Sequence, residues 1–144
     1  QAEMIPAALH YRQPKAIANV GVLPLVPGIA AGQLDALIDS GLQALVLECF
    51  GSGTGPSDNP AFLASLKRAQ DLDVVVVAIT QCHEGGVELD VYEAGSRLRG
   101  AGVLSGGGMT REAVFGKLHA LLGAGLATDD VRHLVELDLC GELA

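Results

Sequence analysis

A glycine-rich turn, Gly51-Ser-Gly-Thr-Gly-Pro56, follows an apolar run over 44–50 and is the first place where the sequence predicts chemistry. An apolar run of this length, bounded by glycine, is typical of a strand buried on both faces of a parallel sheet. Ligands bind such sheets where the strands end, and glycine lets the backbone approach a ligand closely. The turn is therefore a candidate ligand site, although many strand-to-helix turns contain glycine without binding anything.

The glycine pattern matches neither common phosphate-binding motif. The turn lacks the third glycine of G-x-G-x-x-G at the right spacing, and it lacks the Gly-Lys-Ser/Thr of a P-loop. A second glycine run, Gly106 to Gly108, is expected to allow tight contact between a strand and a helix.

Metal-binding and nucleophilic patterns are equally weak. Cys82-His83-Glu84 are adjacent, but consecutive residues rarely place three side chains on one ion, so we predict no metal site. His10, His119 and His133 are scattered and are expected on the surface or on helix faces. Cys82, at the end of an apolar strand, is expected to be a small buried residue. No nucleophile has an evident base beside it.

The composition indicates one α/β domain. The chain has 144 residues, of which 49% are hydrophobic but only 3% aromatic, so the core must consist of aliphatic side chains. The net charge of -8 disfavours nucleic acid as a partner. No apolar run is long enough to span a bilayer, and no signal-peptide pattern is visible. Three widely spaced cysteines favour reduced thiols and a cytoplasmic location.

Apolar runs and helical periodicity alternate along the chain. We expect strands over 20–26, 44–50, 74–79 and 103–104, and helices over 30–40, from 60, from about 94, from 111 and from 129. This alternation predicts a parallel sheet with right-handed crossovers. Pro24 indicates that the first strand either lies at an edge of the sheet or contains a bulge. Residues 1–19 are expected to form a linker, and residues 20–144 the domain.

Capping residues predict where four helices begin or end. Asp58 or Asn59 can cap the second helix, which then has Pro60 at its first position. Thr110 and Thr128 are expected to cap the last two helices, and Gly41 fits the C-terminal end of the first helix.

The segment Phe50-Gly-Ser-Gly-Thr-Gly-Pro56 resembles the motif that begins the second half of the smaller domain of L-asparaginases. Pro27-Gly-Ile29 is similar to the Y-P-G-I motif of the cytoplasmic (type I) branch, with Val26 in place of the tyrosine. The further matching segments, in the same order and at consistent spacing, are 75–82, 92–95, 101–110, 117–118 and 138–142.

This resemblance implies that the chain is the C-terminal domain of such an enzyme, a three-layer α/β/α sandwich around a four-stranded parallel sheet. Family members hydrolyse asparagine to aspartate and ammonia without a cofactor, using threonines of a larger N-terminal domain. The sequence contains neither the Thr-Gly-Gly-Thr nor the Thr-Asp-Thr motif of that domain. We therefore expect no catalytic residues in this chain, no activity of the chain alone, and residues 1–19 to be a remnant of the interdomain linker.

The resemblance also implies roles for four residues. Thr54 and Tyr92 match positions that approach the substrate in a neighbouring subunit, and Thr54 stands where the family usually has Asn. Each could instead have a structural role, Thr54 as a turn residue and Tyr92 as a packed aromatic. Some bacterial members bind asparagine at a second, regulatory site. Cys82 matches a residue lining that site, and Glu48 replaces an arginine there, so it would repel a substrate carboxylate.

The partners implied are L-asparagine, the N-terminal catalytic domain, and further copies in a homodimer or homotetramer. Neither nucleic acid nor membrane is expected. Two alternatives share this domain or its surfaces: the asparaginase-like subunit of glutamyl-tRNA(Gln) amidotransferase, and a regulatory module that senses asparagine or serves only in assembly.

Overall fold

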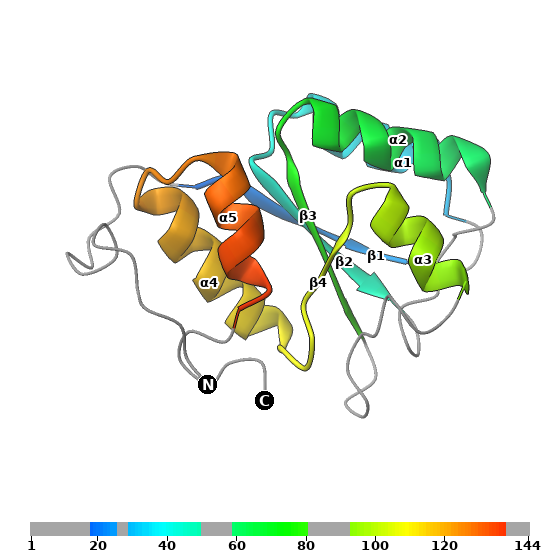
Figure 1. The fold of residues 1–144 in the computed structure, drawn as a ribbon. Helices are drawn as coiled ribbons and strands as arrows, with labels where there is room; N and C mark the ends of the chain where they lie inside the picture. The colour runs from blue at the N-terminus through cyan, green and yellow to red at the C-terminus, as the bar shows by residue number, and fades with distance from the viewer. Residues whose placement is uncertain (1–17, 26–28, 50–58, 81–92, 138–144) are drawn as a thin grey trace.

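The computed structural model describes residues 18–25, 29–49, 59–80 and 93–137 (Figure 1). The elements of this part of the chain are β1 (Val20–Pro24), α1 (Ala31–Asp39), β2 (Ala44–Cys49), α2 (Pro60–Asp71), β3 (Val75–Thr80), α3 (Glu93–Gly100), β4 (Leu104–Ser105), α4 (Arg111–Gly123) and α5 (Thr128–Val135). The four strands form one parallel sheet in the order β1-β2-β3-β4. The expected linker over 1–19 falls almost entirely outside the described residues.

Helices cover both faces of the sheet. Because sequential parallel strands lie side by side, the crossover helices α1, α2 and α3 all lie on one face, and α4 and α5 cover the other (Figure 1). The predicted three-layer α/β/α sandwich with a four-stranded parallel sheet is confirmed.

The two central strands supply both halves of the core. In β2, Leu45, Leu47 and Cys49 pack toward α1, α2 and α3, whereas Ala44 and Val46 pack toward α4 and α5. All six residues of β2 are buried. Two-sided burial explains why the strand is apolar at every position except Glu48 and does not alternate between polar and apolar residues.

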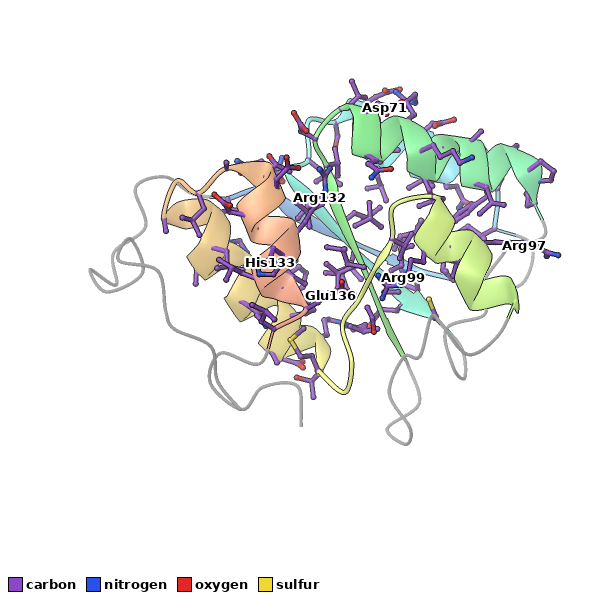
Figure 2. All side chains as sticks on the ribbon, viewed as in Figure 1. Asp71, Arg97, Arg99, Arg132, His133 and Glu136 are labelled. Atoms are coloured by element: carbon purple, nitrogen blue, oxygen red, sulfur yellow. The ribbon has the colours of Figure 1, made fainter. Side chains whose placement is uncertain are left out.

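The edges of the sheet differ. β1 is an edge strand, as Pro24 predicted, because proline cannot donate to a neighbour. At the other edge, the backbone N–H of Ser105 in β4 donates to the Glu136 carboxylate at 2.8 Å. The same carboxylate accepts from Arg99 of α3 at 3.0 Å, and the two side chains meet across β4 in Figure 2. The carboxylate thus takes the place of a further strand.

Two of the predicted N-caps are confirmed and one is wrong. The Asn59 side chain accepts from the N–H groups of Ala61 and Phe62, with Pro60 at the first helical position. The Thr110 hydroxyl accepts from the Ala113 N–H. Thr128, by contrast, is the first residue of α5, and the cap is Ala127, which has no side chain able to bond. Asp129 and Asp130 in the first turn interact favourably with the N-terminal helix dipole instead.

In the second glycine run, Gly106 lies very close to strand β3 and not to a helix. A Cβ on Gly106 would lie 2.6 Å from Ile79 Cγ2 and 2.9 Å from the Ala78 carbonyl oxygen, both in β3. The expected tight contact between a strand and a helix is therefore wrong at Gly106. The glycine is required because its N–H donates to that carbonyl at 2.8 Å, which holds the chain after β4 against β3.

We predict opposite effects for two glycine-to-alanine substitutions. Gly106→Ala should lower the free energy of unfolding by about 2–3 kcal/mol, because the added methyl must displace β3 backbone. Gly116→Ala, in the middle of α4, should raise it by about 0.5–1 kcal/mol, because alanine favours helix and the new Cβ has nothing within 4 Å. Chemical denaturation of the purified variants measures both. Equal effects of the two substitutions would contradict the strand contact at Gly106.

Candidate functional site

The candidate site lies at the carboxyl edge of the sheet, where β2 and β3 end. Cys49 and Thr80, the last residues of these strands, are register partners, so the chain leaves the sheet at neighbouring points. Thr54, Cys82 and Tyr92 follow these strand ends and lie outside the described residues. Glu48 is the one predicted site residue within them.

Glu48 is a buried carboxylate on the central strand. The residue is only 6% exposed, and its side chain points to the face covered by α4 and α5. Arg111 compensates the charge in two-pronged geometry, with Nε donating to Oε2 at 2.8 Å and Nη2 donating to Oε1 at 2.9 Å. Pairs of this geometry are among the strongest charge-assisted hydrogen bonds in proteins.

Sequence reasoning missed Arg111. The pair joins residues 63 positions apart, and no local pattern connects them. One signal was available: a buried acidic residue in an otherwise apolar strand needs a positively charged or hydrogen-bonding partner. The fold supplies that partner by starting α4 at the edge where β2 ends.

Cys49 is not a nucleophile. Its thiol is fully buried on the opposite face of β2 from Glu48. Burial raises the pKa of the Cys49 thiol from 9.0 to about 12, so it stays protonated at neutral pH. A protonated, inaccessible thiol has a structural role.

Lys117 of α4 holds the C-terminal end of α5 in place. Its largely buried ammonium group donates to the Val135 carbonyl at 2.8 Å and to the Leu137 carbonyl. A cation at this position satisfies carbonyls at the end of α5 and complements the helix dipole. Lys117 belongs to one of the matching segments, and its contacts give it a structural role.

Two further findings concern metals and membranes. Among the described residues, no group of three or more His, Cys, Asp or Glu side chains could hold a metal ion. His119 and His133 are exposed on α4 and α5, as expected. Within the same part of the chain, every helix is too short or too polar to cross a bilayer.

Taken together, the chain is a three-layer α/β/α domain whose candidate site lies at the carboxyl edge of a parallel sheet. Residues 19–135 match the family model described as the glutaminase/asparaginase C-terminal domain. The chain belongs to this family.

Relatives and solved structures agree with this assignment. The chain is 40% identical over 124 residues to L-asparaginase 1 of Escherichia coli K12, covering 86% of this chain and 36% of that protein. It superposes on L-asparaginase I of Vibrio cholerae with a TM-score of 0.84 and 37% identity, covering 90% of this chain and 40% of that one. The chain thus spans well under half the length of both proteins.

Relatives with other names share the domain. The human 60 kDa lysophospholipase is 43% identical over 126 residues, covering 87% of this chain and 22% of that protein. One subunit of the glutamyl-tRNA(Gln) amidotransferase of Aeropyrum pernix is 34% identical over 126 residues, covering 88% of this chain and 29% of that protein.

The buried thiol predicts a specific pH dependence of stability. The folded-state pKa of Cys49 is about 12 and its ordinary value is 9.0. Its contribution is therefore fully present below pH 9 and is lost as the pH rises toward 12. Between pH 9 and 10, the free energy of unfolding should fall by about 1 kcal/mol more in the wild type than in Cys49→Ala.

Denaturant titrations of both proteins at the two pH values measure this difference. The variant controls for every other titratable group, because those groups are the same in both proteins. Parallel pH dependence would contradict the burial of the thiol.

Proposed function

We propose that this chain is the C-terminal domain of an L-asparaginase, which hydrolyses L-asparagine to L-aspartate and ammonia. In this proposal the chemistry belongs to a threonine-bearing N-terminal domain, and this domain supplies interface and secondary substrate-binding residues. The observation that carries the proposal is the close match of a whole domain to L-asparaginase I of V. cholerae, a match that covers only 40% of that protein.

The described residues support a non-catalytic role. Cys49 is buried and protonated, and Glu48 is engaged by Arg111. Activated nucleophiles need a base within hydrogen-bond reach, and neither residue provides such a pair. The covalent step is therefore assigned to the unmatched part of the relatives.

Thr54 and Tyr92 are proposed to contact the substrate in trans. The support is topological: their chain segments start from Cys49 and Thr80, which are paired in register at one edge. Ligands of parallel sheets bind at this edge. The Thr54 hydroxyl would bond the substrate where an Asn would otherwise offer a carbonyl and an amide.

A regulatory asparagine site at Glu48 and Cys82 is the weaker proposal. A site for the α-carboxylate of asparagine needs a positively charged side chain whose hydrogen-bond donors are available to the ligand. Position 48 instead holds a buried carboxylate, which already accepts the Nε and Nη2 donors of Arg111. We therefore favour an assembly and substrate-binding role over a sensing role.

The amidotransferase subunit is the alternative enzyme. It shares this domain at 34% identity, against 40% for L-asparaginase 1 of E. coli. We favour the asparaginase because it is supported by both the sequence match and the structural match. The lysophospholipase match covers 22% of that protein, a smaller share than the 36% of L-asparaginase 1 of E. coli.

We further propose a homodimeric or homotetrameric enzyme in the cytoplasm. A substrate-binding contribution in trans requires at least two copies. The described cysteine, Cys49, is a free thiol, which fits a reducing compartment.

A domain replacement tests the proposed function. The matched 124 residues of E. coli L-asparaginase 1 are replaced by this chain, and ammonia release from L-asparagine is measured. We expect turnover well above that of a deletion that leaves the segment out, because the replacement restores the domain that completes the site. Turnover of glutamine, measured in parallel, reports the substrate preference. A folded chimera that releases no ammonia would contradict the proposal.

A further inference from the structure

Glu48 and Arg111 each occupy a position that local physics disfavours. Glu48 is the one charged residue of β2, whose six residues are all buried. Arg111 is the first residue of α4, where the helix dipole is positive and repels a cation. Such departures from local preference concentrate at functional or strained sites.

The two departures compensate each other. The Arg111 side chain is 53% exposed while that of Glu48 is 7% exposed, so the arginine reaches in from the surface to a buried acid. The shortest contact, Nη2 to Oε2, is 2.7 Å. A pair that only added surface stability would not need a buried carboxylate, because exposed pairs stabilise about as much without the desolvation penalty.

Glu48 joins three elements at the carboxyl edge, one through its backbone carbonyl and one through its ion pair with Arg111. The Glu48 carbonyl accepts from the Leu25 N–H at 2.8 Å, just beyond the end of β1. The Glu48 carboxylate holds the start of α4 through Arg111. In the first turn of α4, the Val114 N–H donates to the Thr110 carbonyl at 3.0 Å.

We propose that Glu48 and Arg111 are positioning residues for the substrate-binding edge. The pair locks the end of β1, the end of β2 and the first turn of α4 into one unit, and so sets the point from which the chain toward Thr54 leaves the sheet. The proposed effect of the pair on catalysis rests on the function proposed above. The connection of the three elements by Glu48 and Arg111, called the lock below, does not depend on that function.

Amide hydrogen exchange of the full chain tests the lock, with Leu25 and Val114 as probes. Arg111→Glu gives the sharpest result, because a carboxylate at this position favours the helix dipole. If Arg111 affected its own helix alone, Val114 would exchange more slowly. The lock predicts the reverse: both probes should exchange about ten- to one-hundredfold faster, because Glu48 loses a charged partner and gains a repulsive one.

Three measurements keep this test specific. Arg111→Lys retains the charge without the two-pronged geometry, so both probes should fall between wild type and Arg111→Glu. Arg68→Gln removes the two surface ion pairs that Arg68 of α2 makes with Asp35 and Asp39 of α1, and it should leave both probes unchanged. The Val75 N–H, bonded to the Gln43 carbonyl at the opposite edge of the sheet, reports any global loss of stability.

Slower exchange at Val114, or an unchanged rate at Leu25, would overturn the lock. Acceleration of Val75 to the same extent as the other two probes would also overturn it, since the effect would then be global.

The asparagine kinetics of the whole protein give the second readout. Arg111→Glu should raise KM by about three- to tenfold with little change in kcat, because displaced substrate contacts weaken binding, whereas Arg68→Gln should change neither. An unchanged KM would overturn the link to the substrate edge. A wild-type protein without asparaginase activity would overturn the proposed function, and the exchange experiment would still decide on the lock.

Discussion

Burial of β2 on both faces is the constraint on which the rest of this domain depends. The strand lies between β1 and β3, and helices cover it above and below. The core is largely aliphatic, although the sequence analysis expected only aliphatic side chains and Phe62 of α2 is fully buried in it. Small and branched side chains fit this geometry, because they pack well between a parallel sheet and its helices. The other strands of the described chain pair with this strand or with β3, and the helices contribute to the two cores that cover the faces of the sheet.

Within the described part of the domain, three charged side chains hold the ends of helices or the edge of a strand in place. Glu48 fixes the start of α4, Lys117 the end of α5, and Glu136 the free edge of β4. Each bonds a backbone group or an opposite charge that would otherwise be exposed or unsatisfied. Because their partners come from distant parts of the chain, these contacts define one arrangement of the helices on the sheet.

The strands, their parallel pairing and most helix limits could be predicted from the sequence, because apolar runs, glycines and caps are local signals. Asn59 with Pro60 is the clearest case. The Glu48–Arg111 pair could not be predicted, since it depends on where α4 begins relative to β2. Thr128 misled for a local reason: threonine is common at N-caps, but α5 begins one residue earlier than expected. The roles of Thr54, Tyr92 and Cys82 stay predictions.

The proposed function is that of a domain that completes an active site without carrying its nucleophile. The most direct test is a sensitive assay of ammonia release from L-asparagine by the purified chain alone, with its mass in solution determined on the same sample. We expect a folded protein, monomeric or dimeric, with no turnover above the buffer rate. Sustained turnover that follows the chain through purification would contradict it, because the chemistry would then have to come from residues of this domain.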